Sequence, residues 1–198
     1  MLKIGITGGI GTGKSTICEI FALIGIPVYN ADEAAKSLMV TNKTLKQELI
    51  AAFGPNTFNN EGSLDRTYLS NIVFNDKKAL KQLNTLVHPA VLADFKKWCS
   101  QQHTPYVLKE AALLIESESY RECDYTILVE SPIELRIQRL LSRDKSSEGQ
   151  IRARIANQLP EGEKAKLANY LLLNDEEHLL IPQILALHSQ FLEASRNL

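Results

Sequence analysis

The chain has 198 residues, of which 44% are hydrophobic and 23% are charged, and its formal net charge is -1. This balance is typical of one ordinary globular domain, and it excludes a disordered or fibrous chain. The nearly neutral charge gives no general reason to expect binding to nucleic acid or to an anionic membrane. Any anionic ligand must therefore be held by local positive groups.

The three cysteines, Cys18, Cys99 and Cys123, are odd in number, widely separated and without a C-x-x-C pair. This spacing predicts neither a disulfide framework nor a zinc site, and it favours a reducing cytoplasm. No apolar stretch has the form of a signal peptide or the length of a membrane span. The sequence leaves the oligomeric state open between a monomer and a small homo-oligomer.

Short apolar runs alternate with segments of helical periodicity along the chain. Strands are predicted at residues 2–7, 27–30, 106–110, 125–130 and 170–174. Helices are predicted at residues 15–23, 31–40, 45–53, 69–74, 77–100, 132–142, 147–159 and 178–193. This alternation predicts an α/β fold with a five-stranded parallel sheet that is flanked by helices.

Three parts of the chain differ in character. The predicted core comprises residues of about 1–35, 105–142 and 160–198. The mainly helical residues 36–104 separate the second strand from the third, and we interpret them as an acceptor-binding insertion. We interpret the arginine-rich residues 143–159 as a small lid, in which Ser147 and Gln150 predict a helix capping box.

A glycine-rich motif runs from Gly8 to Ser15 and fits the pattern G-x-x-x-x-G-K-[ST] between the first predicted strand and a helix. Its glycines allow backbone N–H groups to surround a phosphate chain, and the helix N-terminus adds partial positive charge. Lys14 is expected to reach the β- and γ-phosphates, and the Ser15 hydroxyl to ligate Mg²⁺. The alternative, a chance glycine-rich turn, is disfavoured by this position. The motif therefore predicts a nucleoside triphosphate site.

The remaining sequence decides between the classes of protein that carry such a loop. The nearest match to a guanine-reading motif, residues 42–45, lacks the aspartate, and the third strand ends in Glu110 where a hydrolase usually has an aspartate. Asp32 follows the second strand, at the edge of a parallel sheet where ligands collect. It is a candidate base for an acceptor hydroxyl, with helix capping as the alternative role. These features favour a kinase.

Further motifs follow the loop in order over nearly the whole chain. They are Ala-Asp at 31–32, Gly-x-Leu-x-Arg at 62–66, Val-Phe at 73–74, Leu-Asn at 83–84, His-Pro at 88–89, Leu-Leu-x-Glu at 113–116, Gln-Arg-Leu at 138–140, Arg-Asp at 143–144, Gln158 and Asn174. Together with residues 4–16, this ordered set resembles the dephospho-coenzyme A kinase family. The combination of the loop with Ala-Asp is specific, and the later motifs gain weight from their order.

The resemblance implies a P-loop kinase fold of the nucleoside-monophosphate-kinase type, with ATP as co-substrate and Mg²⁺. It implies phosphorylation of the ribose 3′-hydroxyl of dephospho-coenzyme A, the last step of coenzyme A synthesis. By motif match, the implied ATP-binding residues are Gly11, Thr12, Gly13, Lys14, Ser15 and Thr16. Asp32 is the implied base, Arg139 and Arg143 neutralise phosphate charge, and Asn174 lies near the adenine.

The chain departs from the family pattern at three positions. Asn30 stands where an aspartate is common, Ala112 where a proline is common, and Asp175 where a glycine is common after Asn174. With Asn30 uncharged, the catalytic role falls on Asp32. The other two departures concern local loop geometry.

Several charged residues have two interpretations. His88 either contacts the acceptor or is a loop histidine between two helices, because Pro89 disfavours a helical conformation at the residue before it. Arg66 either binds an acceptor phosphate or is an ordinary surface arginine. Glu116 either contacts Mg²⁺ through water or forms a surface cap or pair, which we favour. The spacing of Arg136, Arg139 and Arg143 predicts one helix face and a shared anion.

Two rival functions stay open from the residues alone. One is a kinase for another small acceptor, such as a nucleoside monophosphate, and the other is a nucleotide-binding regulatory module. We predict the dephospho-coenzyme A kinase, with Lys14, Asp32 and Arg139 as catalytic residues and Arg66, His88 and Asp32 as acceptor-binding residues. The expected partner is a small molecule, with neither nucleic acid nor membrane.

Overall fold

The computed structural model describes residues 1–59, 61–144 and 146–197. Residue 145 of the predicted lid and residue 60 of the predicted insertion lie outside this description. The strands are β1 (Leu2–Gly8), β2 (Val28–Asn30), β3 (Tyr106–Glu110), β4 (Tyr125–Glu130) and β5 (Tyr170–Leu173). The helices are α1 (Lys14–Leu23), α2 (Ala31–Thr41), α3 (Lys43–Phe53), α4 (Arg66–Asn75), α5 (Lys77–Cys99), α6 (Ile133–Arg143), α7 (Glu148–Ala156), α8 (Glu161–Ala165) and α9 (Leu180–Arg196), with short 3-10 turns at Pro55–Thr57 and Ser119–Glu122.

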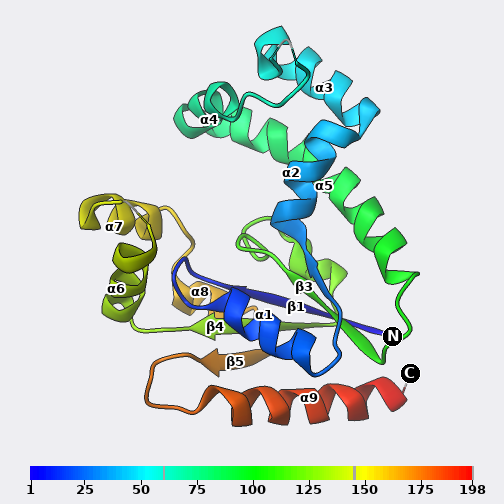
Figure 1. The fold of residues 1–198 in the computed structure, drawn as a ribbon, viewed down its shortest axis with the longest axis vertical. Helices are drawn as coiled ribbons and strands as arrows, with labels where there is room; N and C mark the ends of the chain where they lie inside the picture. Colours follow the sequence, from blue (N-terminus) through cyan, green and yellow to red (C-terminus); the bar gives the residue numbers. More distant parts are fainter. Residues whose placement is uncertain (60, 145, 198) are drawn as a thin grey trace. The chain divides into compact units, whose positions relative to one another are not determined.

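The five strands form one sheet in the order β2-β3-β1-β4-β5 (Figure 1). β1 pairs in parallel with β3 and β4, and β4 pairs in parallel with β5. The predicted five-stranded parallel sheet and P-loop kinase fold are confirmed. Because the strands run in parallel, their carboxyl ends lie at one edge, where the glycine-rich loop follows β1.

The main core lies where α1 and α9 pack on the sheet. Ile4 and Ile6 of β1 are fully buried, as are Phe21 of α1 and Phe191 of α9. The ring of Phe191 also contacts Tyr106, with 5.3 Å between the ring centroids. These apolar contacts hold β1 and α1 in place, and with them the two ends of the loop.

The chain divides into two compact units, one of residues 1–29 and 102–198 and the other of residues 30–101. In the second unit the long helix α5 contacts α2, α3 and α4. This helix runs through Pro89 without a break, so the alternative of a loop histidine at position 88 is wrong. The assignment of residues 36–104 to acceptor binding and of 143–159 to a lid stays a prediction.

Two helix starts follow from local capping. Ser147 Oγ accepts from the Gln150 N–H at 3.4 Å, and Gln150 Oε1 accepts from the Ser147 N–H at 2.9 Å, which confirms the predicted capping box. α4 begins earlier than predicted because Asp65 accepts from the Tyr68 N–H at 2.8 Å. Across the described part of the chain, no helix is both long and apolar enough to cross a membrane.

Candidate active site

The loop between β1 and α1 has the backbone that its glycines permit. Gly11 and Gly13 have φ angles of 82° and 87°, in the left-handed region that glycine adopts without strain. Gly13 is the N-cap residue of α1 and has no side chain to cap the helix. The first N–H groups of α1 are therefore presented at a helix N-terminus, which is a suitable place for a phosphate.

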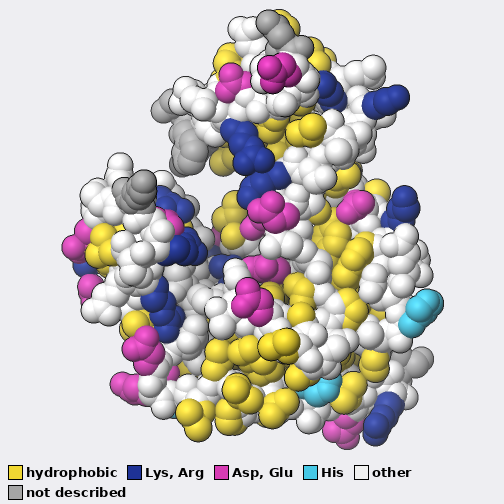
Figure 2. All heavy atoms as spheres, in the orientation of Figure 1, with side chains coloured by type: hydrophobic (Ala, Val, Ile, Leu, Met, Phe, Trp, Pro, Cys, Tyr) yellow, Lys and Arg dark blue, Asp and Glu magenta, His cyan; other side chains and the backbone are white. Residues whose placement is uncertain are grey.

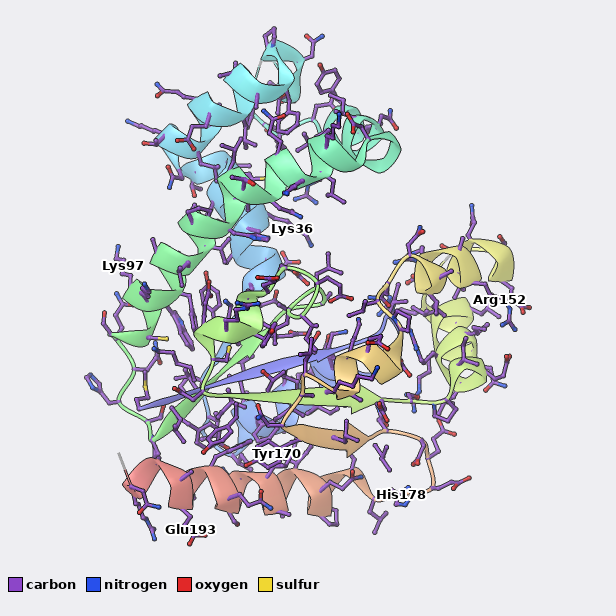
Figure 3. All side chains as sticks on the ribbon, turned by 180° about the vertical axis from the view of Figure 1, so that it is seen from behind. Lys36, Lys97, Arg152, Tyr170, His178 and Glu193 are labelled. Atoms are coloured by element: carbon purple, nitrogen blue, oxygen red, sulfur yellow. The ribbon has the colours of Figure 1, made fainter. Side chains whose placement is uncertain are left out.

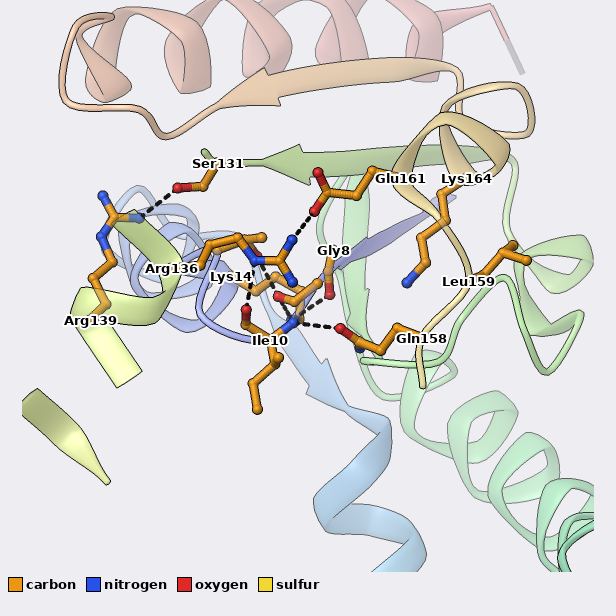
Figure 4. Close-up of polar contacts among 12 residues, drawn as sticks. Gly8, Ile10, Lys14, Ser131, Arg136, Arg139, Gln158, Leu159, Glu161 and Lys164 are labelled. Atoms are coloured by element: carbon orange, nitrogen blue, oxygen red, sulfur yellow. Dashed lines mark hydrogen bonds and ion pairs between the residues drawn. The ribbon is translucent and has the colours of Figure 1, made fainter. Parts of the chain in front are cut away.

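The Lys14 side chain folds back over this loop. Its Nζ donates to the carbonyl oxygen of Gly8 at 2.8 Å and to that of Gly9 at 3.3 Å (Figure 4). The ammonium group is thus held at the loop by neutral acceptors. A phosphate oxygen carries more charge than a carbonyl and forms the stronger hydrogen bond, so it would displace these carbonyls.

Thr12 and Gly8 shape the loop from within. The Thr12 hydroxyl is buried and donates to the Gly9 carbonyl at 2.9 Å. A Cβ on Gly8 would lie 2.5 Å from the carbonyl oxygen of Val129, so only glycine allows β1 to end this close to β4. The Thr12 side chain therefore stabilises the loop. A contact between ATP and the backbone of Thr12 stays a prediction.

Ser15 meets an acidic residue that the sequence analysis passed over. Ser15 Oγ lies 3.5 Å from Oε1 of Glu110, a largely buried residue at the end of β3. Ser15 lies in the first turn of α1, which contacts β3, and Glu110 is the register partner of Ile6 in β1. A hydroxyl and a carboxylate are both hard oxygen ligands of the kind that Mg²⁺ prefers. The chemistry of this pair fits a magnesium ion.

Arg139, a predicted catalytic residue, and Asn174, a predicted nucleotide ligand, lie together beside the loop. Arg139 Nη1 donates to the Asn174 carbonyl and to Ser131 Oγ, each at 3.2 Å. The Asn174 Nδ2 group donates to the Thr12 carbonyl at 2.8 Å. The carboxyl end of β5 is therefore linked to the loop through one side-chain amide.

The three arginines of α6 contact different partners. Arg136 is buried and pairs with Glu161, whereas Arg143 pairs with Asp144 at 2.8 Å. The hydrogen bonds that Arg143 donates to the Asp144 carboxylate raise the pKa of Arg143 above its ordinary value. Figure 2 shows basic side chains gathered over α6 and α7. An anion shared by all three arginines does not fit Arg136 in this structure, and it stays a prediction for the other two.

The second unit carries Asp32 at the start of α2. Asn30 Oδ1 accepts from the Glu33 N–H at 2.9 Å, so Asn30 is the capping residue of this helix. The alternative of a cap at Asp32 is therefore wrong, and its exposed carboxylate lies in the first helical turn. Arg66 is exposed at the start of α4, and His88 is half-buried within α5.

Glu116 forms an ion pair, with its Oε1 2.6 Å from Nζ of Lys164, and this partner is buried rather than at the surface. Asp175 holds the turn after β5, where the family commonly has glycine. Its carboxylate accepts from the backbone N–H of His178 at 2.9 Å and from His178 Nδ1 at 2.8 Å. Figure 3 shows His178 between β5 and α9. These hydrogen bonds lower the pKa of Asp175 from 3.8 to about 2, and the bond from the His178 backbone has the largest effect. The ionised Asp175 carboxylate therefore stabilises the folded state above pH 3.8, and this stabilisation is lost as the pH falls towards about 2.

The parallel sheet, the strand-loop-helix unit and the lysine over the loop define a P-loop nucleotide-binding protein. The model of the dephospho-CoA kinase family matches residues 2–179, and the chain belongs to this family. It is 38% identical over 187 residues to dephospho-CoA kinase of Bacteroides fragilis, with 94% of this chain and 91% of the relative covered.

Two solved structures agree with this assignment. A protein from Thermus thermophilus is 33% identical, with a TM-score of 0.82 and 97% of both chains covered. Dephospho-CoA kinase from Campylobacter jejuni is 28% identical, with a TM-score of 0.67 and 98% of both chains covered. The chain is a kinase of coenzyme A synthesis. The resemblance of its sequence to the dephospho-coenzyme A kinase family is confirmed. The rival functions are not favoured.

Proposed function

We propose that the loop from Gly8 to Ser15 binds ATP with Mg²⁺ and that Asp32 directs its γ-phosphate to the ribose 3′-hydroxyl of dephospho-coenzyme A. The observation that carries this proposal is the position of Lys14 Nζ over the loop, 2.8 Å from the Gly8 carbonyl. A lysine so placed reaches the phosphates that the helix N-terminus attracts.

In this proposal, different residues have different roles in phosphoryl transfer. The backbone from Gly11 to Thr16 holds the phosphate chain, and Lys14 and Arg139 neutralise charge on the transferred group. Asp32 accepts the hydroxyl proton as the oxygen forms its bond to the γ-phosphorus and the bond to the departing ADP breaks. Arg143 and Asn174 complete the nucleotide site, and Arg66 and His88 bind the acceptor.

Ser15 and Glu110 would hold Mg²⁺, which would supply positive charge to neutralise the phosphates. Ser15 Oγ and Glu110 Oε1 lie 3.5 Å apart, so both oxygens could contact one cation. Glu110 thus occupies the end of β3, the position at which a hydrolase usually has an aspartate.

An acceptor assay tests the substrate. ADP release from Mg²⁺-ATP is measured with dephospho-coenzyme A, with nucleoside monophosphates, or with no acceptor. We expect acceleration by dephospho-coenzyme A alone, with the 3′-phosphorylated product identified by mass spectrometry. Acceleration only by a nucleoside monophosphate would contradict the acceptor, and equal ADP release without any acceptor would contradict transfer.

A magnesium titration tests the role of Glu110. We expect EDTA to abolish turnover, and Glu110→Gln to raise the Mg²⁺ concentration for half-maximal activity by about 10–100-fold, the usual effect of a lost metal-supporting group. Glu19→Gln makes the same change at an exposed site on α1 and should leave the titration unchanged. An unshifted midpoint for Glu110→Gln would show that this carboxylate does not serve the metal.

We further infer a cytoplasmic location, which the free thiols of Cys18, Cys99 and Cys123 support. The proposed partner is the small-molecule acceptor, without nucleic acid or membrane, and the protein acts as a monomer or small homo-oligomer.

A further inference from the structure

The first turn of the glycine-rich loop is held from outside by side chains distant in sequence. The Ile10 N–H donates to Gln158 Oε1 at 2.9 Å, across 148 residues of chain. The Ile10 carbonyl accepts from Arg136 Nε, also at 2.9 Å (Figure 4). Both polar groups of one loop residue are thus bonded to side chains from other elements, which fixes the orientation of its backbone.

Arg136 is itself fixed in place. It is 3% exposed, and its Nη1 pairs with the carboxylate of Glu161 at the start of α8. Gly9 lies directly against the guanidinium group, because a Cβ at this position would lie 2.2 Å from Nη2 and 2.6 Å from Cζ. The absence of a side chain at Gly9 therefore allows Arg136 to lie on the loop.

The segment of residues 158–164 has a second anchor. Lys164 is fully buried, and its Nζ lies 2.6 Å from Glu116 Oε1. The same Oε1 accepts from the Leu159 N–H at 3.3 Å. The segment is thus held at both ends, by Gln158 on the loop and by Lys164 on Glu116. Leaving a buried charge without its partner is strongly destabilising, so the pair with Glu116 holds Lys164 in place.

The space enclosed by these side chains is small. Gly9, Arg136, Gln158, Glu161 and Lys164 help to line a pocket with a volume of about 70 Å³. Sites for small molecules usually have about 300–1,000 Å³. Two basic and two acidic side chains, which pair with one another, also leave little net charge for an anion. The arrangement fits a brace better than a further ligand site.

We propose that Gln158 is a positioning residue that holds the Ile10 peptide and thereby preorganises the glycine-rich loop for ATP. Residues 158–164, with Arg136 and Glu116, form the brace that keeps Gln158 in place. This inference rests on the proposed role of the loop in binding ATP. A loop that is ordered before the nucleotide arrives pays less conformational entropy on binding, so loss of the brace weakens ATP affinity.

The test replaces Gln158 by methionine, which keeps the length of the side chain and removes its acceptor oxygen. We expect the Kd for ATP, measured by calorimetry, to rise about tenfold, the change that one net hydrogen bond supports. The KM for dephospho-coenzyme A should stay near wild type. Gln158→Glu keeps an acceptor oxygen at the same reach and should recover most of the ATP affinity.

Two further variants separate positioning from simple stability. Gln190→Met makes the same change on the exposed face of α9 and should alter neither substrate. Gly9→Ala should weaken ATP binding by displacing Arg136 from the loop. If Gln158→Met does not fold, Gln158→Asn, whose amide is one methylene shorter, replaces it in the same measurement.

A lower Tm with an unchanged Kd for ATP would overturn the proposal, because Gln158 would then serve stability alone. A rise only in the acceptor KM would also overturn it and would assign the pocket to the acceptor. Failure of the proposed ATP site itself is a separate result: wild-type protein would then bind no ATP, whatever residue occupies position 158.

Discussion

The variant Asp32→Asn is expected to lose about 10²–10⁴-fold in turnover number, which is the usual contribution of a general base, while the Kd for ATP stays near wild type. The asparagine keeps the shape of the side chain and removes its ability to take a proton. ATP affinity should persist because the proposed phosphate ligands belong to the loop and to α1. Turnover is measured as coenzyme A formed at saturating ATP and acceptor.

The structure makes this test cleaner than the sequence allowed. Asn30 is the capping residue of α2, so Asp32→Asn keeps the cap hydrogen bond from the Glu33 N–H to Asn30. Glu33→Gln is a matched control, because it neutralises the next carboxylate in the same helical turn. Glu33 forms an exposed ion pair with Lys36, which contributes little to stability.

Two results would contradict the role of Asp32. Near-normal turnover in Asp32→Asn would show that the hydroxyl proton leaves by another route. An equal loss in Glu33→Gln would show that the effect comes from the charge of the helix N-terminus rather than from one carboxylate. A fall in turnover restricted to Asp32→Asn supports the base.

The parts of the fold that the sequence predicted depend on local patterns. All five strands were found within a residue or so of their predicted bounds, because buried parallel strands are short apolar runs between turns. The glycine-rich loop was equally accessible, since its chemistry depends on consecutive residues. The helix α8 was missed because Glu161–Ala165 is too short to show helical periodicity.

The parts of the site that the sequence missed depend on tertiary pairing. Glu161 and Lys164 are polar residues in a charged stretch, which ordinarily indicates a solvated surface. Glu161 is half-buried and Lys164 is fully buried, and their ion-pair partners, Arg136 and Glu116, lie 25 and 48 residues away in the sequence. Glu110 was passed over because an aspartate was expected at the end of the third strand. A search for either acid at that position would have found it.

The roles of Asp32, Arg66 and His88 stay predictions for a different reason. All three belong to residues 30–101, and the loop belongs to the other compact unit. Their assignment rests on motif matches alone, so kinetic measurements are needed to test it.

The second large effect is expected for Lys14→Met. Methionine keeps the unbranched length of lysine and removes the charge that the proposed mechanism places on the transferred phosphate. Loss of one preorganised group of this kind commonly costs about 10²–10³-fold in turnover number. Because the group acts on charge that develops during transfer, kcat and kcat/KM for ATP should fall together, with a smaller change in the acceptor KM.

Lys14→Arg distinguishes charge from geometry. Lys14 Nζ fits between the Gly8 and Gly9 carbonyls at 2.8 and 3.3 Å, a space suited to a compact ammonium group. A planar guanidinium is larger and directs its donors differently, so we expect Lys14→Arg to recover little activity. Lys166→Met is the matched control, because it removes an exposed lysine that pairs only with the exposed Glu163 among its described ionic contacts. Full activity in Lys14→Arg would show that positive charge alone suffices, and full activity in Lys14→Met would remove Lys14 from the mechanism.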